Sequence, residues 1–215
     1  MCDNWEWGIY NCAPIAILPT GAGEPLVLDN LDLSAYAAAG WLPSGQDIVF
    51  VGSSNGPGAG LRLYVKNLAG KPRPFSPTRI SADYGQGLTS PGRKTAVALG
   101  PDGRPTLYPL DGGMPVRLPS TEPGDLPMHW TPDGKYLFYS LHTRVMKVEL
   151  SNGRVSHWKE VFPGDPAGIS VIYGFRVSTD GRSYVYNYSR HLKPPVLGTG
   201  SEMIGVAFLQ SLIRS

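Results

Sequence analysis

The 215-residue chain is poor in cysteine and has no long apolar run. Its two cysteines, Cys2 and Cys12, lie near the start, and without a Cys-x-x-Cys pair they give no support to a zinc site or a thioredoxin-like site. They could form a disulfide, although two free thiols are the simpler interpretation. No stretch approaches the roughly 20 apolar residues of a membrane-spanning helix, and the first residues lack the basic and apolar segments of a secretory signal. We therefore expect neither an export signal nor a membrane span, and no compartment follows from this chain alone.

Charge of a single sign is also scarce. The 19 Lys and Arg residues nearly balance the 17 Asp and Glu residues, which leaves a net charge of +2, and no run of five like charges occurs. The densest basic stretch, residues 66–73, has its cations spaced between apolar residues. A nucleic-acid-binding surface normally shows a stronger cluster, so we predict no nucleic-acid partner.

Sequence motifs of catalytic sites are missing. The chain contains no Gly-x-Ser-x-Gly nucleophile elbow, and residues 90–94 are one residue too long for a Ser-x-x-Lys motif. The glycine-rich residues 52–60 lack the Lys-Ser/Thr pair and the following helix of a phosphate-binding loop, so we interpret them as a long hairpin loop. We therefore predict no catalytic, cofactor-binding or metal-binding residues, and no enzyme activity.

The histidines do not assemble a metal site in the sequence. His129 and His157 fall in predicted strands of one repeat, where they could face one another across a sheet, and the nearest carboxylates are those of Asp133 and Glu149. Two imidazoles on strands fall short of the three or four ligands that zinc requires. The four histidines are His129, His142, His157 and His191. We predict no metal and no cofactor.

Glycine and proline are abundant, and they recur with a regular period. The chain has 27 glycines and 21 prolines, about twice the usual share. One set of turn glycines is spaced by 47, 42 and 47 residues, and a second set by 47, 43 and 40 residues. A period of forty-odd residues with strand-like runs between the turns is typical of a β-propeller. The first set is Gly45, Gly92, Gly134 and Gly181, and the second is Gly23, Gly70, Gly113 and Gly153.

Each repeat is interpreted as four strands. The third repeat is the clearest, with predicted strands at 126–131, 136–140, 144–150 and 155–161. The sequence predicts an all-β fold, a β-propeller or partial propeller of four-stranded antiparallel blades, over residues 1–191. The predicted parts are a half-blade at about 5–30, blades at about 35–77, 83–120 and 126–161, a partial blade at 170–191 and an atypical tail at 192–215.

The two ends depart from the repeat. Trp5, Trp7 and Ile9 alternate as the second strand of the half-blade would, and an exposed adhesive patch of Trp5, Trp7 and Tyr10 is the alternative. Residues 204–213 are apolar and suit a short helix or strand on the open edge. Since one blade cannot bury both of its faces, blades must stack. The sequence leaves open a small closed ring, an open arc or a structure completed by a partner.

The segment His129-Trp130-Thr131-Pro132-Asp133-Gly134-Lys135 resembles the Trp-Ser-Pro-Asp-Gly-Lys motif of TolB-like, WD-repeat-like bacterial β-propellers. Further phrases at 63–68, 107–113 and 180–188 are similar to the C-terminal propeller of bacterial eukaryotic-like serine/threonine kinases. The resemblance covers about residues 10–191. No kinase motif is present, neither His-Arg-Asp nor Asp-Phe-Gly, so kinase activity is not implied.

The resemblance implies a non-catalytic module for protein interaction or sensing, with a protein or peptide partner that contacts loops at one end of the blades. Relatives linked to kinases would carry it outside the cytoplasm. Two alternatives remain: a propeller domain associated with a peptidase or lyase, and a gene fragment without independent function. Uncovered blade edges would also permit self-association.

Overall fold

The computed structural model describes residues 10–11, 15–28, 33–42, 44–55, 59–81, 89–92, 94–141, 144–161, 164–178, 183–190 and 210–212. Within these ranges the chain forms strands and turns and contains no helix, which confirms the predicted all-β class. No described segment is a helix long and apolar enough to cross a membrane. The chain divides into two compact units, Met1–Arg117 and Leu118–Ser215.

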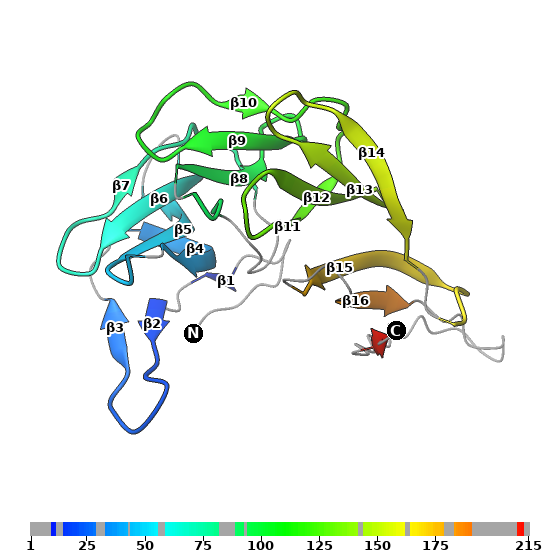
Figure 1. The fold of residues 1–215 in the computed structure, drawn as a ribbon. Helices are drawn as coiled ribbons and strands as arrows, with labels where there is room; N and C mark the ends of the chain where they lie inside the picture. Colours follow the sequence, from blue (N-terminus) through cyan, green and yellow to red (C-terminus); the bar gives the residue numbers. More distant parts are fainter. Residues whose placement is uncertain are drawn as a thin grey trace, which may run out of the picture. The chain divides into compact units, whose positions relative to one another are not determined.

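The first unit contains one large sheet, one smaller sheet and one hairpin, all antiparallel (Figure 1). The large sheet has the order β1-β4-β5-β6-β7, the smaller sheet the order β10-β9-β8, and β2 pairs with β3. The strands are β1 (Tyr10–Asn11), β2 (Ile15–Ile17), β3 (Leu26–Leu28), β4 (Leu33–Trp41), β5 (Asp47–Ser54), β6 (Leu61–Asn67), β7 (Arg73–Pro74), β8 (Thr95–Leu99), β9 (Pro105–Pro109) and β10 (Val116–Arg117).

The second unit contains a four-stranded antiparallel sheet in the order β11-β12-β13-β14 and a second sheet in the order β15-β16-β17. The four-stranded sheet reproduces the strands predicted for the third repeat. The strands are β11 (Leu126–Trp130), β12 (Tyr136–Leu141), β13 (Arg144–Glu149), β14 (Val155–Glu160), β15 (Ile169–Val177), β16 (Tyr184–Arg190) and β17 (Gln210–Leu212).

The Pro-Asp-Gly motif builds the turn between β11 and β12. The Thr131 amide donates to the Tyr136 carbonyl at 2.9 Å, and the Gly134 amide donates to the Thr131 carbonyl at 2.8 Å. The Asp133 carboxylate accepts from the Thr131 hydroxyl at 2.6 Å and from the Lys135 amide at 3.0 Å. These bonds satisfy the polar groups of the turn locally, which explains why this motif marks the repeat.

The equivalent turn between β4 and β5 uses the same bonds. The Leu42 amide donates to the Asp47 carbonyl at 2.8 Å, and the Gly45 amide donates to the Leu42 carbonyl at 2.9 Å. Ser44 stands where the third repeat has aspartate, and its hydroxyl accepts from the Gln46 amide at 3.3 Å. The first repeat therefore makes the turn with a different capping side chain.

We expect the glycine after β13 to be sensitive to substitution. Gly153 has a φ of +72°, and an added Cβ would lie 2.9 Å from the Pro119 ring, whereas Gly124 has a φ of +95° and open space around it. Gly153→Ala should therefore cost about 2 kcal/mol and Gly124→Ala about 1 kcal/mol, since only the first adds a clash to the backbone strain. Urea unfolding of both variants measures the difference. Equal losses would show that the Pro119 contact is absent.

In the first unit, β5 supplies side chains to cores on both of its faces. Phe50 packs in a cluster with Leu28 of β3 and Tyr64 of β6. Val49 and Val51 point the other way, into a cluster that includes Ala96 of β8. Phe50, Val49 and Val51 are all fully buried. A central strand whose two faces are both covered is what stacked sheets require.

In the second unit, side chains from both sheets form one core. Phe138 of β12 and Phe175 of β15 are buried in the same cluster, together with Met128 of β11 and Tyr186 of β16. The Phe138 and Phe175 ring centroids lie 6.1 Å apart. The cluster therefore joins the two sheets face to face, as in neighbouring blades.

The first described strand pairs outside the predicted half-blade. Tyr10 pairs with Tyr36 and Asn11 pairs with Ala35 of β4, so β1 extends the large sheet and does not belong to the β2–β3 hairpin. Alternation fits a strand in either sheet, and pairing partners are non-local, so the sequence could not distinguish them. Trp5, Trp7, Cys2 and Cys12 lie outside the described residues.

The C-terminal segment is described only at residues 210–212. There β17 pairs antiparallel with β16, so this part of the apolar segment is a strand and not a helix. Residues 191–209 lie outside the described ranges, as do Gly181 and His191. The predicted domain limit at 191 stays a prediction.

Candidate functional site

An irregularity in an outer strand of the second unit positions Trp158. Lys159 pairs with Val145 and His157 pairs with Met146, so Trp158 is the extra residue of a β-bulge. A bulge bends its strand and changes the direction of a side chain. In a regular strand Trp158 would share a face with Ser156 and Glu160, which are both exposed.

The bulge directs the Trp158 ring onto the aromatic core of this unit. Its centroid lies 5.3 Å from that of Phe138, 5.6 Å from that of Phe175 and 5.8 Å from that of Tyr184. All three pairs are edge-to-face, with interplanar angles of 70°, 75° and 86°. This geometry is favourable for aromatic rings, so the indole is held firmly in place.

A small pocket lies beside the indole. It has a volume of about 110 Å³, and Phe138, Trp158, Pro132 and Val177 form its apolar walls. An engineered apolar cavity of about 150 Å³ accepts benzene, so this pocket suits a branched aliphatic side chain. His129, Thr131 and Ser178 complete the lining.

The hydroxyl groups at the rim are already engaged. The Thr131 hydroxyl donates to Asp133, and the Ser178 hydroxyl donates to the Ser183 carbonyl at 3.1 Å and accepts from the Ser183 amide at 2.9 Å. The Thr131 hydroxyl bond, followed by the Lys135 amide bond, lowers the pKa of Asp133. Asp133, which follows the lining residue Pro132, is therefore a carboxylate anion near the pocket, and it also lies 3.8 Å from the Lys135 Nζ.

A cation contacts the same aromatic cluster. The Lys159 Nζ is 4.6 Å from the centroid of the Tyr184 ring and 6.0 Å from that of Trp158. Both distances fall within the range of a cation–π contact. The pocket thus has a fixed tryptophan, an apolar wall and charges of both signs nearby.

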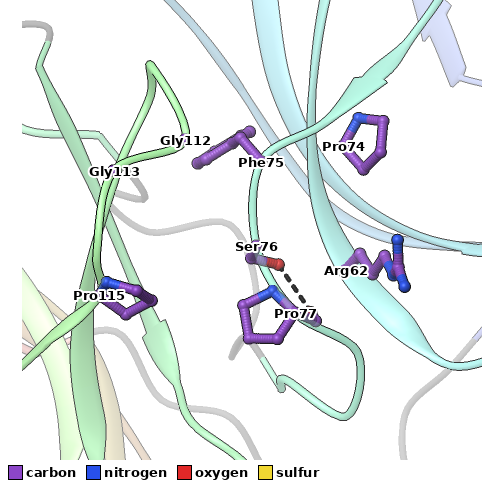
Figure 2. A pocket seen from close by; sticks show the side chains of 8 residues that line it. All are labelled: Arg62, Pro74, Phe75, Ser76, Pro77, Gly112, Gly113 and Pro115. Carbon is purple, nitrogen blue, oxygen red and sulfur yellow. Dashed lines mark hydrogen bonds between the residues drawn. The ribbon is translucent and has the colours of Figure 1, made fainter.

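A larger cleft lies in the first unit, beside β6 and β7 (Figure 2). Its volume is about 310 Å³, and its lining includes Arg62, Pro74, Pro77 and Pro115. Figure 2 shows Arg62 and Pro74 on one side of residues 75–77, and Gly112, Gly113 and Pro115 on the other. Fewer large apolar side chains and more prolines line this cleft than line the Trp158 pocket.

The segment between these walls is tied to β6. The Ser76 hydroxyl accepts from the Leu63 amide at 2.8 Å and donates to the Pro77 carbonyl at 3.0 Å. The Phe75 amide donates to the Leu63 carbonyl at 3.0 Å. These hydrogen bonds hold residues 75–77, the floor of the cleft, against β6. The neighbouring proline nitrogens cannot donate such bonds.

A third hollow is an apolar groove along β2. It has a volume of about 340 Å³ and is lined by Ile15, Ile17, Trp41 and Ile48, among others. Trp41 is 46% exposed and Leu18, at its end, is 69% exposed. This surface carries apolar side chains that the described residues leave in contact with solvent.

The two histidines of the third repeat are not brought together. His129 lies in β11 and His157 in β14, and the strands β12 and β13 separate them. At about 4.8 Å per strand, the backbones are roughly 14 Å apart. The prediction that they could face one another is wrong, because the sequence does not show which strands are edges. No group of three or more His, Cys, Asp or Glu residues that could hold a metal occurs among the described residues.

The two motif-like segments lie at ordinary strand ends and turns. Residues 52–54 belong to β5 and Ser53 pairs with Leu61 of β6, so the start of the predicted 52–60 loop is strand, while residues 56–58 lie outside the described residues. The Ser90 amide donates to the Thr95 carbonyl at 2.8 Å and closes the turn before β8. His142 lies outside the described residues.

No family model matches the chain, and no curated protein matches its sequence. A TolB candidate from Agrobacterium tumefaciens has a TM-score of 0.59 at 16% identity, over 80% of this chain and 61% of that one. TolB from Acinetobacter baumannii has a TM-score of 0.55 at 17% identity, over 91% of this chain and 48% of that one. Oligogalacturonate lyase from Vibrio parahaemolyticus has a TM-score of 0.52 at 13% identity, over 78% of this chain and 54% of that one.

These similarities confirm the predicted fold, a β-propeller arrangement like that of TolB. The chain spans less than two thirds of the length of each of these structures. At such identities the similarity concerns the fold alone. The closer resemblance to kinase-linked propellers stays a prediction.

Proposed function

We propose that this propeller chain is a non-catalytic binding module for a protein or peptide partner, and that the pocket beside Trp158 receives one aliphatic side chain of that partner. The observation that supports this proposal is the β-bulge, which turns Trp158 from the solvent side of β14 into an aromatic wall. Bulges often redirect side chains beside functional sites. A buried pocket walled by tryptophan is also a frequent anchor point in protein interfaces.

The polar groups around the pocket favour binding over catalysis. The Thr131 and Ser178 hydroxyls serve the turns that hold the pocket open. Hydroxyls that are already hydrogen-bonded in this way shape the pocket and orient a ligand in it. A general base, in contrast, needs a free lone pair directed at the substrate. The resemblance to kinase-linked propellers favours a sensing role, in which partner binding is the input.

The alternative is a domain associated with a peptidase or a lyase. An oligogalacturonate lyase has a similar fold, and the fold alone does not separate the two functions. Turnover assays on peptides and on oligogalacturonate decide between them. Cleavage that scales with the amount of purified chain would contradict a non-catalytic module.

The binding proposal can be tested with a pocket-filling variant. Peptides selected from a random library on the full chain should share an aliphatic residue, and Val177→Phe should weaken their binding by about tenfold or more because the added ring fills the pocket. Fluorescence anisotropy of a labelled selected peptide measures the affinity.

The matched control is Val155→Phe, which adds the same ring to the half-buried valine at the start of β14, away from the pocket lining. Circular dichroism confirms that both variants fold. We expect Val155→Phe to bind within about twofold of the parent chain. Equal losses in the two variants, or selected peptides without a shared aliphatic residue, would refute the pocket as the anchor.

A further inference from the structure

One segment of the first unit carries unbalanced positive charge. Residues 59–81 contain five cations and no Asp or Glu. In the part of the chain that the structure describes, none of the five forms an ion pair with a carboxylate. Lys66 and Arg73 donate to backbone carbonyls instead, which leaves their charge uncompensated. The five are Arg62, Lys66, Lys71, Arg73 and Arg79.

Arg62 is the cation that lines the cleft. It is half-buried near the start of β6, and its register partner on β5 is Gly52, which offers no side chain across the strand pair. Its Nε is buried and makes no hydrogen bond within the described part of the chain. Buried polar atoms are nearly always paired, so the unpaired Nε of this guanidinium calls for an explanation.

The walls of the cleft favour an extended chain that lies flat on them. Pro74, Pro77 and Pro115 are rigid, and Gly112 and Gly113 let another backbone approach closely. Strand addition is blocked here, because β7 has only two residues and one of them is proline. A ligand must therefore be recognised through its side chains.

We infer that this cleft is a second binding site, for an acidic peptide segment whose carboxylate pairs with the Arg62 guanidinium. A guanidinium fits a carboxylate with two parallel hydrogen bonds.

The inference is tested with labelled decaglutamate, amidated at its C-terminus, on the full chain at low ionic strength. Decaglutamate should bind, decaglutamine should not, and added salt should weaken binding. Arg62→Gln should reduce the affinity about tenfold. Arg154→Gln is the matched control, since it removes one exposed arginine from the second unit and should change the affinity less than about twofold.

Several outcomes would overturn the inference. Equal losses in Arg62→Gln and Arg154→Gln would indicate attraction by net charge, and no binding of decaglutamate would exclude an acidic peptide. Displacement of the peptide by equimolar inorganic phosphate would indicate a free-anion site. If Arg62→Gln does not fold, Arg62→Lys keeps the charge and should still weaken binding, because lysine lacks the planar pair of donors.

This second site is independent of the Trp158 pocket. Val177→Phe should leave decaglutamate binding unchanged, because Val177 belongs to the second unit and the cleft to the first. A negative result at Arg62 therefore leaves the proposed anchor pocket untouched, and a negative result at Val177 leaves the acidic-peptide site untouched.

Discussion

Phe175→Ala should lower the free energy of unfolding by about 3–5 kcal/mol, as full deletion of a buried aromatic ring does. Phe175 is fully buried in the core that joins the two sheets of the second unit. Its ring lies 5.6 Å from Trp158 and 5.9 Å from Tyr184, so the deletion removes contacts on several sides at once. Urea unfolding followed by circular dichroism measures the loss.

The matched control is His157→Ala, an exposed ring deleted from the same unit. Exposed substitutions usually change stability by less than about 0.5 kcal/mol. A loss below about 1 kcal/mol for Phe175→Ala would contradict the stacking of β15 and β16 on the four-stranded sheet, since an unstacked ring would already be in contact with water.

Local turn chemistry made much of the fold predictable from sequence. The turn between Thr131 and Tyr136 is closed by bonds within six residues, and such turns fix the register of the strands on both sides. Residues 48–51 form an unbroken apolar run, and the structure buries Phe50 on one face of β5 and Val49 and Val51 on the other. Both signals lie within one repeat, so no distant partner was needed to interpret them.

Pairing partners and irregularities were not predictable in the same way. Tyr10 looks like a strand residue in any sheet, and only the fold shows that it pairs with Tyr36. The bulge at Trp158 interrupts the period of two, so Val155, Trp158 and Val161 are the less exposed positions, three residues apart. That spacing of apolar residues was visible in the sequence and was the available sign of a bulge.

The Arg62 cleft escaped the sequence analysis for a different reason. Its two walls come from residues 62–77 and 112–115, which the fold brings together across two sheets. The positive charge of residues 66–73 is visible in the sequence, but the lack of acidic residues extends over the whole segment 59–81. A stretch as long as a strand pair that has several cations and no acidic residue is therefore the sequence signal for this cleft.

The buried lysine of β6 should be more important for stability than its charge suggests. Lys66 is only 5% exposed, and its Nζ donates to the carbonyls of Asn67 at 3.0 Å, Leu68 at 3.0 Å and Gly70 at 2.6 Å. These carbonyls form the turn that leads from β6 to β7. The ammonium group therefore holds the turn in the shape that lets β7 complete the sheet.

We expect Lys66→Met to cost about 2–4 kcal/mol, because it keeps the aliphatic stem and removes several hydrogen bonds from a charged donor. Lys71→Met, at an exposed lysine just beyond the turn, should change stability by less than about 0.5 kcal/mol. Urea unfolding gives the global effect, and hydrogen exchange at the Phe75 amide, which donates to Leu63, reports whether β7 has opened. If Lys66→Met is as stable as the parent chain, the cost of burying the ammonium group offsets its three bonds, and the turn keeps its shape through its backbone alone.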